Sequence, residues 1–319
     1  MKILFVVSGG DAPGIHSVLY HTAMLAQSHG DILIGAKGGF PGVLSEQFVP
    51  ITARELLPWL TIAGSYLPSS RDPVLAQAEG RDRLKEVLVK HAIDALLLFG
   101  GDGTLRHIPP LLDSWGIACI GLPTTIDNDV PGTDLTLGFD SAANFAYSAI
   151  DGMRATGYAL PGRIFTLETL GGDTGFLALE VAQGASADCV LLPEYAYDTE
   201  QVIVRLQAAI QERGQALLVY SEGVKGKDDL LNVITEKTGI RVRGSKLGHA
   251  QRGATPSHRD RMLATTISEL THGGLHRGVH SGVVVVKEGK TMLHKGILSS
   301  LAPKRPDVAI YKRINRLDA

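Results

Sequence analysis

Residues 91–130 read HAIDALLLFGGDGTLRHIPPLLDSWGIACIGLPTTIDNDV, and this stretch decides the fold. Ala95–Phe99 is an unbroken apolar run that ends at two glycines and passes into a helix-like pattern. Such a pattern is typical of a buried parallel strand that runs into a turn facing a ligand. A second apolar run, Ala118–Leu122, ends in a similar turn. Because ligands of open α/β sheets bind beyond the carboxyl ends of the strands, we expect both ends to face one crevice, the candidate active site.

Strand-like and helix-like runs alternate along the rest of the chain. The first strand is predicted over Lys2–Val7, and it leads through the turn Ser8–Gly14 into a helix that runs to about Gln27. Further strands are predicted over residues 31–36, 163–169, 189–192, 216–220, 241–246 and 283–286, and further helices over residues 138–156, 200–211, 229–236 and 257–271. The alternation predicts an α/β fold of two Rossmann-like lobes, with mainly parallel sheets covered by helices on both faces.

A chain of 319 residues is too long for a typical single compact domain. We place the change of lobe near Gly138, so that residues 1–138 with about 252–304 form a larger lobe, and residues 139–251 with 305–319 a smaller one. The valine run 283–286 is expected to return to the larger lobe as a buried strand. The region after residue 42 is less regular, and the basic stretch 305–319 is expected to be a mobile tail.

Composition narrows the class of protein. The net charge is -2, from 31 basic and 33 acidic side chains, so nothing favours a nucleic acid or an anionic membrane as the main partner. Cys119 and Cys189 both lie in apolar runs, which favours buried thiols in a reducing compartment over a disulfide or a metal site. No apolar run approaches the roughly 20 residues that span a bilayer. Met1–Val7 is too short for a signal peptide and reads as a strand. We expect a cytoplasmic protein.

The central stretch and the first turn together offer the groups that phosphoryl transfer needs. That reaction requires positioned phosphate oxygens, a divalent cation, and a base or orienting group for the attacking hydroxyl. The glycine turns at Gly9-Gly10 and Gly100-Gly101 can present backbone N–H groups to phosphates, helped by the helices that follow. Asp102 and Asp129 carry the hard oxygen ligands that Mg²⁺ takes, which leaves Asp127 to accept a proton from a substrate hydroxyl.

Taken singly, each of these features has a simpler structural explanation. The run Asp127-Asn128-Asp129 also fits an Asx-turn with capping. The loop Gly64–Pro73 surrounds Arg71 and could be a plain surface loop, or it could present that arginine as a clamp for an anion. His249 and several arginines could equally form a solvated face or structural ion pairs.

Four motifs, in this order, resemble the phosphofructokinase A family, and the resemblance covers essentially the whole chain. The motifs are Ser8–Gly14, Gly100–Thr104, Thr124–Asp129 and Leu247–Gly253. The resemblance implies that the larger lobe binds ATP and Mg²⁺ and that the smaller lobe binds a sugar phosphate. It also implies a homotetramer, or a dimer, in which neighbouring subunits complete each site.

The resemblance assigns roles residue by residue. Asp127 matches the base that takes the proton of the sugar 1-hydroxyl, and Asp102 matches the residue that holds Mg²⁺. The implied catalytic residues are Asp127, Thr125, Asp129 and Arg71. The implied donor site is Gly10, Arg71, Asp72, Gly101, Asp102, Gly103 and Thr104. The implied sugar-phosphate site is Thr125, Asp127, Arg163, Leu170, Gly171, Gly172, Glu222, Arg243, His249 and Arg252, with Arg163 and Arg243 reaching the phosphate of a neighbouring subunit.

Two positions bear on the phosphoryl donor. Pyrophosphate-using members of the family carry an Asp after the Gly-Gly-Asp and a Lys before the Thr-Ile-Asp. Gly103 and Thr124 stand at these positions here, and both are small, so the resemblance favours ATP as the donor.

One departure from the family pattern keeps three functions open. Leu170-Gly171-Gly172 replaces a Met-Gly-Arg, so an arginine that stabilises the transferring phosphoryl group is missing. The first hypothesis is an ATP-dependent 6-phosphofructokinase that makes fructose 1,6-bisphosphate. The second is a kinase for another ketose phosphate, or a pyrophosphate-dependent relative. The third is a non-catalytic regulatory subunit that binds a sugar phosphate.

Overall fold

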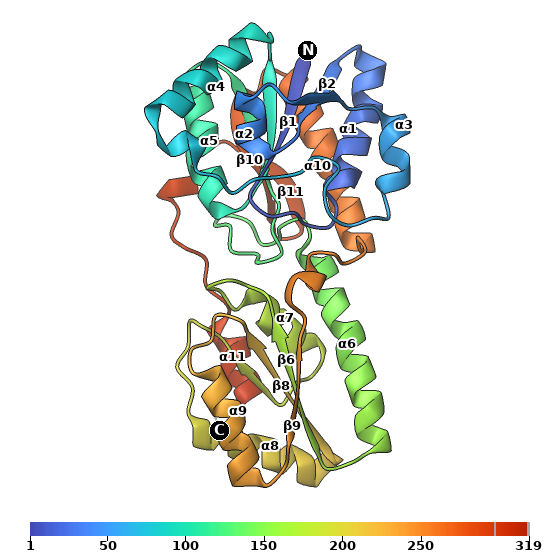
Figure 1. The fold of residues 1–319 in the computed structure, drawn as a ribbon, viewed down its shortest axis with the longest axis vertical. Coiled ribbons are helices and arrows are strands. Elements are labelled where there is room, and N and C mark those ends of the chain that lie inside the picture. Colours follow the sequence, from blue (N-terminus) through green and yellow to red (C-terminus); the bar gives the residue numbers. More distant parts are fainter. Residues whose placement is uncertain (297, 318–319) are drawn as a thin grey trace. The chain divides into compact units, whose positions relative to one another are not determined.

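Two sheets, each covered by helices, organise the chain (Figure 1). The computed structural model describes residues 1–296 and 298–317. It divides into two units: unit 1 is Met1–Ser141 with Thr255–Lys304, and unit 2 is Ala142–Ala254 with the residues from Arg305 onward. The α/β class expected from the alternating pattern is confirmed.

Unit 1 contains a seven-stranded sheet in the order β11-β10-β5-β4-β1-β2-β3. Its strands are β1 (Lys2–Ser8), β2 (Ile32–Ala36), β3 (Phe48–Pro50), β4 (Ala95–Gly100), β5 (Ala118–Pro123), β10 (Ser281–Lys287) and β11 (Lys290–His294). The edge strand β3 pairs antiparallel with β2, and the edge strand β11 pairs antiparallel with β10. The other neighbouring strands of this sheet pair parallel. The main helices are α1 (Ile15–His29), α2 (Gly39–Leu44), α3 (Ala53–Leu56), α4 (Ala78–Lys90), α5 (Asp102–Asp113) and α10 (His258–His276). The valine run 283–286 is the buried β10, as predicted.

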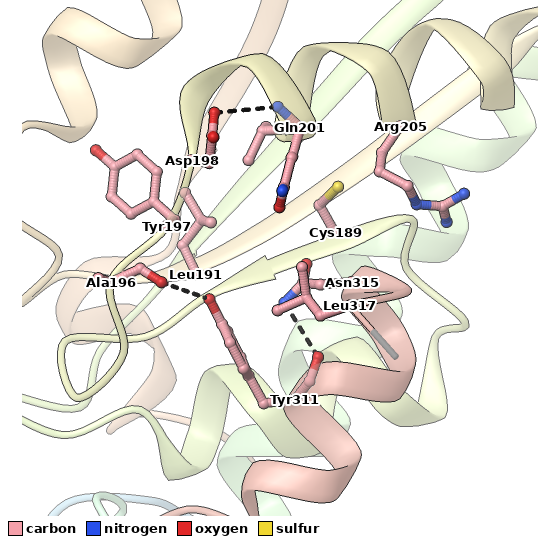
Figure 2. A pocket seen from close by; sticks show the side chains of 11 residues that line it. Cys189, Leu191, Ala196, Tyr197, Asp198, Gln201, Arg205, Tyr311, Asn315 and Leu317 are labelled. Atoms are coloured by element: carbon pink, nitrogen blue, oxygen red, sulfur yellow. Dashed lines mark hydrogen bonds between the residues drawn. The ribbon is translucent and has the colours of Figure 1, made fainter. Parts of the chain in front are cut away.

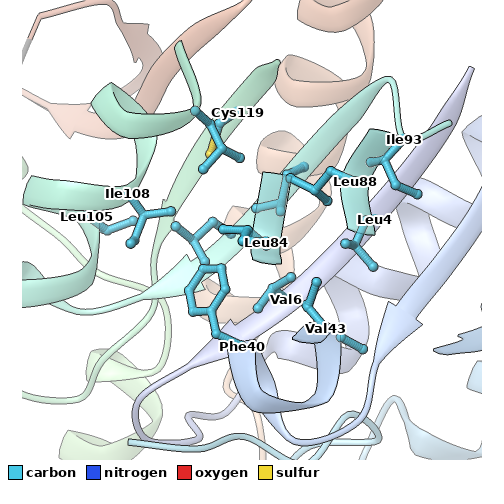
Figure 3. Close-up of a cluster of buried hydrophobic side chains, with 14 of the residues drawn as sticks. Leu4, Val6, Phe40, Val43, Leu84, Leu88, Ile93, Leu105, Ile108 and Cys119 are labelled. Atoms are coloured by element: carbon cyan, nitrogen blue, oxygen red, sulfur yellow. The ribbon is translucent and has the colours of Figure 1, made fainter. Parts of the chain in front are cut away.

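Alternate residues of the central strands build the core of unit 1 (Figure 3). Successive side chains of a strand point to opposite faces, so Leu4 and Val6 of β1 share one face of the sheet. Phe40 of α2 and Leu84 of α4 pack against this face. Cys119 of β5 lies in the same cluster and is fully buried, which confirms the prediction of a buried thiol. This core holds the strands whose ends carry the site.

Unit 2 contains a four-stranded, fully parallel sheet in the order β7-β8-β6-β9. The strands are β6 (Arg163–Thr169), β7 (Cys189–Leu191), β8 (Gln215–Ser221) and β9 (Val242–Lys246). Its helices are α7 (Phe176–Gly184), α8 (Thr199–Arg213), α9 (Lys227–Thr238), the short 3₁₀ helix η3 (Gly248–Gln251) and α11 (Val308–Asn315). The helix α6 (Phe139–Ala159) also belongs to this unit from Ala142 onward.

The expectation of a mobile tail over residues 305–319 is wrong for residues 308–315, and residues 318–319 lie outside the part of the chain that the structure describes. Residues 308–315 form α11, which docks on the edge strand β7. The side-chain amide of Asn315 pairs with the backbone of Val190, accepting from its N–H at 3.0 Å and donating to its carbonyl at 2.9 Å. Tyr311 donates a hydrogen bond to the Ala196 carbonyl, and both residues line a small pocket that Cys189 also reaches (Figure 2). Asn315 thus satisfies backbone groups that an edge strand otherwise leaves open.

The region after residue 42 is more regular than expected, because α4 lies there. None of the helices formed by residues 1–296 and 298–317 combines the length and the apolar character needed to cross a membrane.

Candidate active site

Three parallel strands of unit 1 end side by side. The register pairs Ser8 of β1 with Gly100 of β4, and Gly100 with Pro123 of β5. From β1 the sheet continues in one direction to β2 and in the other to β4. Ligands of doubly wound sheets bind where the strand order reverses in this way. The turns that follow β1, β4 and β5 therefore meet at the expected position of a ligand.

A pocket of about 620 Å³ opens beside these turns, which is within the usual range of small-molecule sites. Four predicted donor-site residues line it: Arg71, Asp72, Gly103 and Thr104. The loop that carries Arg71 is fixed to the end of β1, because the Gly9 N–H donates to the Ser70 carbonyl at 3.1 Å. Arg71 is exposed and lines the pocket, which fits both interpretations of this loop, so the anion clamp stays a prediction.

The remaining donor-site residues lie in the turns themselves. Gly101 is the N-cap of α5 and Asp102 its first helical residue, and no side chain caps this end of the helix. Ser8 Oγ and Thr104 Oγ1 share a hydrogen bond of 3.2 Å, which joins the turn containing Gly10 to the start of α5. Gly103 and Thr104 line the pocket together with His107, Ile108 and Leu111, so the pocket lies along one side of α5 and includes its first turn, where the positive end of the helix dipole lies.

Asp102 has a partner that the sequence interpretation missed. Nε of Arg106 donates a hydrogen bond of 2.6 Å to Asp102 Oδ1, one helical turn further along α5. The spacing of four residues was the available signal, since such pairs lie on the same face of a helix. Arg106 fixes the orientation of the carboxylate predicted to hold the metal ion.

The loop after β5 is built by its hydroxyl and amide side chains. Thr125 Oγ1 accepts a hydrogen bond from the Asp127 N–H at 3.1 Å. Asn128 adopts a left-handed conformation, φ +54°, and its side chain accepts from the Thr136 N–H at 3.0 Å and donates to the Asp134 carbonyl at 3.1 Å. The printed bonds of Asn128 reach six and eight residues along the chain, so they close a longer loop and are not those of an Asx-turn. These two residues hold Asp127 and Asp129 at the strand end.

The carboxylates at this edge of the sheet interact electrostatically. Burial, together with the negative charges of Asp127 and Asp102, raises the pKa of Asp129 to about 6. The interaction places all three carboxylates within electrostatic reach. Nζ of Lys304 donates a hydrogen bond of 2.7 Å to the Asn128 carbonyl, a contact that the sequence did not indicate. Burial lowers the pKa of Lys304 to about 8.

Unit 2 gathers a second group of predicted residues at its own strand ends. Thr169 of β6 pairs in register with Ser221 of β8, so Leu170–Gly172 and Glu222 follow neighbouring strands. Oε1 of Glu222 accepts hydrogen bonds from the N–H groups of Gly171, at 3.2 Å, and Gly172, at 2.8 Å. Gly172 has φ +57°, a conformation that favours glycine.

Gln251 connects this loop to the predicted phosphate-binding segment. Its side chain is buried, accepts from the Leu170 N–H at 2.7 Å and donates to the Ala142 carbonyl at 3.3 Å. His249 and Arg252 lie on either side of it, in and just after η3. Gln251 was inside a recognised motif, but its role as an anchor depends on a contact 81 residues away.

Two predicted residues lie elsewhere in unit 2. Arg163 is the first residue of β6, and Arg243 of β9 pairs in register with Phe165, near the same end. Leu170 follows the opposite end of β6, and seven strand residues extend over roughly 20 Å. A single unit 2 therefore does not bring these two arginines together with Glu222, His249 and Arg252.

Comparison with known proteins identifies the family. The phosphofructokinase family model matches residues 2–272. The chain is 35% identical to the ATP-dependent 6-phosphofructokinase of Aquifex aeolicus, over 91% of this chain and 91% of that protein. It is 37% identical to the enzyme of the same name from Lactobacillus delbrueckii subsp. bulgaricus, over 89% of this chain and 91% of that protein.

Solved structures agree on the fold. The phosphofructokinase of Pichia pastoris superposes with a TM-score of 0.86 at 23% identity, covering 94% of this chain and 35% of that one. A pyrophosphate-dependent phosphofructokinase from Marinobacter aquaeolei gives a TM-score of 0.84 at 22% identity, covering 97% of this chain and 86% of that one. The resemblance inferred from the four motifs is thus confirmed, and the chain belongs to the phosphofructokinase family.

Proposed function

We propose that the protein is an ATP-dependent 6-phosphofructokinase, which makes fructose 1,6-bisphosphate in glycolysis. The observation that carries the proposal is the pocket along α5, together with the electrostatic interaction of Asp102, the first residue of this helix, with Asp129 in the loop after β5. The names of the relatives at 35% and 37% identity support the same activity. A cytoplasmic location is proposed because Cys119 and Cys189 are free, buried thiols.

ATP is the proposed phosphoryl donor. A Cβ atom added at Gly103 meets no atom within 4 Å, so the pocket keeps its full width at this position. Thr124 is buried, and its hydroxyl donates to the Leu122 carbonyl at 2.8 Å, so this side chain does not narrow the pocket. We propose that Arg71, Asp72, Gly103 and Thr104, with the backbone of Gly10 and Gly101, bind the nucleotide and its phosphates.

The acidic side chains fit a magnesium ion. Asp127 and Asp102 lie close enough to raise the pKa of Asp129, and the negative charge of this group favours a divalent cation beside it. We propose that Asp102 holds this ion, with Arg106 orienting the carboxylate. A bound magnesium ion supplies positive charge opposite the phosphate oxygens.

We propose that Asp127 acts as the general base. Its carboxylate takes the proton of the sugar 1-hydroxyl as that oxygen bonds to the γ-phosphorus and the bond from this phosphorus to the bridging oxygen of ADP breaks. Thr125 fixes the backbone of Asp127 and is proposed to contact the sugar, and Asp129 completes the acidic group. Arg71 is proposed to stabilise the transferring phosphoryl group, since it lines the donor pocket and Gly172 provides no side chain for this task.

The sugar phosphate is proposed to bind at the strand ends of unit 2. Glu222 grips sugar hydroxyls beside Leu170, Gly171 and Gly172, while His249 and Arg252 hold the 6-phosphate. Arg163 and Arg243 lie near the other end of the sheet, which supports the proposal that they serve a neighbouring subunit. On this proposal the enzyme is a homotetramer, or a dimer, with shared sites.

The Leu170–Gly172 loop favours one alternative, a kinase for another ketose phosphate. Both N–H groups of the glycine pair bind Glu222, so the sugar-facing loop differs from the arginine-bearing family pattern. A coupled assay with fructose 6-phosphate, other ketose phosphates, ATP and pyrophosphate tests these functions. We expect the highest kcat/KM with fructose 6-phosphate and ATP. A preference for another sugar or for pyrophosphate contradicts the proposal, and sugar-phosphate binding without product indicates a regulatory subunit.

A further inference from the structure

Three side chains of unit 1 converge far from the strand ends that carry the candidate active site. Asp31 comes directly before β2, and His272 and His276 lie in the last part of α10. β2 runs parallel to β1, so its first residues lie at the amino edge of the sheet, opposite the edge with the donor pocket. The group is therefore separate from the site described above.

The three side chains meet at one carboxylate oxygen. Asp31 Oδ2 lies 2.8 Å from His272 Nε2 and 2.7 Å from His276 Nε2. All the ligand atoms of this group lie within 4.8 Å of one another. The two histidines are four residues apart on α10, which places both rings on one face of the helix. The other carboxylate oxygen, Oδ1, accepts from the Met1 amino group at 2.7 Å.

The group is buried on one side and exposed to solvent on the other. The side chains of Asp31 and His272 are 1% and 3% exposed, whereas that of His276 is 32% exposed. His29 packs its ring 4.8 Å from that of His272 and 4.7 Å from that of His276. Nδ1 of His29 is bonded to the Leu25 carbonyl at 3.0 Å, so this residue forms a wall of the group.

We propose that Asp31, His272 and His276 bind a divalent transition-metal ion of the zinc class, with a fourth position open to water. Two imidazole nitrogens and one carboxylate oxygen form a ligand set that suits Zn²⁺ or Co²⁺, whereas Mg²⁺ prefers oxygen ligands. A tetrahedral ion with bonds of about 2.0–2.1 Å keeps its ligands roughly 3.3 Å apart. Each ring nitrogen therefore lies about 0.5 Å further from Oδ2 when the ion is bound. His276 gains this distance by rotating at its exposed side, and the distance to the buried His272 grows by a small rotation of the Asp31 carboxylate.

The ion would cross-link two segments that lie far apart in the sequence. Asp31 and His272 are separated by 241 residues, and the ion joins α10 to the segment between α1 and β2. Because an ion that binds only the folded state stabilises it by mass action, the proposal predicts a melting temperature that rises with the concentration of Zn²⁺.

The test uses the full chain, freed of metals by a chelator and kept in excess Mg²⁺ so that oxygen-ligand sites are filled. Zn²⁺ is titrated by calorimetry, and Co²⁺ by the visible absorption of its nitrogen-ligated form. We expect one tight site per chain. The His276→Gln variant is expected to bind Zn²⁺ at least about tenfold more weakly, since even residues behind the ligands contribute that much.

A matched control lies on the same helix. His258 is exposed at the start of α10, so His258→Gln should bind Zn²⁺ like the wild type. Thermal unfolding of each variant without metal shows whether the variant folds. We expect the His276→Gln variant to fold, because the His276 side chain is partly exposed. Absence of a one-equivalent site in the wild type, or equal Zn²⁺ affinity in the His276→Gln and His258→Gln variants, overturns the proposal. In either case Asp31 and the histidines form a hydrogen-bonded group only.

Discussion

The side chain of Asn128 accepts a hydrogen bond of 3.0 Å from the backbone N–H of Thr136, eight residues along the chain. The same side chain donates to the Asp134 carbonyl, so one amide closes the whole loop that follows β5. Asp127 and Asp129 flank this residue in the sequence. Their positions therefore depend on an amide that takes no part in the proposed chemistry.

Replacing Asn128 should separate loop order from backbone strain. Asn128→Ala loses both hydrogen bonds and keeps a side chain at φ +54°, whereas Asn128→Gly loses the same bonds without the strain. We expect both variants to have a lower kcat. In urea unfolding the alanine variant should be less stable than the glycine variant by about 1 kcal/mol. Equal stability of the two variants would show that the left-handed backbone is not maintained.

An acidic side chain at Gly103 should interfere with ATP. The Cβ position is open and faces the donor pocket, so Gly103→Asp places a negative charge beside the nucleotide phosphates. We expect the KM for ATP to rise by about tenfold or more, which corresponds to roughly 1.4 kcal/mol. Gly152→Asp is the matched control, because this glycine also lies in a helix with open space around its Cβ position. An unchanged KM for ATP in Gly103→Asp removes this glycine from the donor site.

An arginine at Gly172 should have two opposing effects. No atom lies within 4 Å of its Cβ position, so the side chain fits, but φ +57° costs about 1 kcal/mol for a residue other than glycine. Gly172→Arg and Gly172→Ala should therefore lose similar stability in thermal unfolding. We expect only the arginine variant to show a higher kcat. A gain in the alanine variant as well would assign the effect to the backbone.

The raised pKa of Asp129 predicts a dependence of stability on pH. Its pKa in the folded chain is about 6, against an ordinary value of 3.8. A raised pKa favours folding below the ordinary value, and this contribution is lost as the pH rises through the folded value. The Asp129→Asn variant has no carboxyl group at this position, so it does not lose stability through this ionisation. Without metal it should therefore gain stability over the wild type between about pH 4 and 7, as measured by urea unfolding, while its activity falls. A constant difference across this range contradicts the proposed titration.

Some parts of the fold could be predicted because their signals are local. Ala95–Gly100 and Ala118–Pro123 are continuous apolar runs, so β4 and β5 were visible in the sequence. α4 was missed although its buried residues Leu84, Val87 and Leu88 have the i, i+3, i+4 spacing of one helix face, so its signal was also local. α11 was missed because its docking depends on the pairing of Asn315 with Val190, 125 residues away.

The same distinction holds for the site. The glycine turns and the Asp127-Asn128-Asp129 run could be found from their place after predicted strands. Lys304 and Gln251 could not, since Lys304 reaches Asn128 across 176 residues and Gln251 reaches Leu170 across 81. Contacts of this kind come from tertiary packing and leave no pattern within one segment of the sequence.

The most direct test of the account is the kinetics of Asp127→Asn, because the whole assignment depends on a base at this position. The amide has nearly the same shape but accepts no proton at neutral pH, so kcat should fall by about 10²–10⁴-fold while the affinity for fructose 6-phosphate changes little. Asp113→Asn, at the far end of α5, is the control and should keep wild-type kcat. A kcat of Asp127→Asn close to that of the wild type would contradict the account.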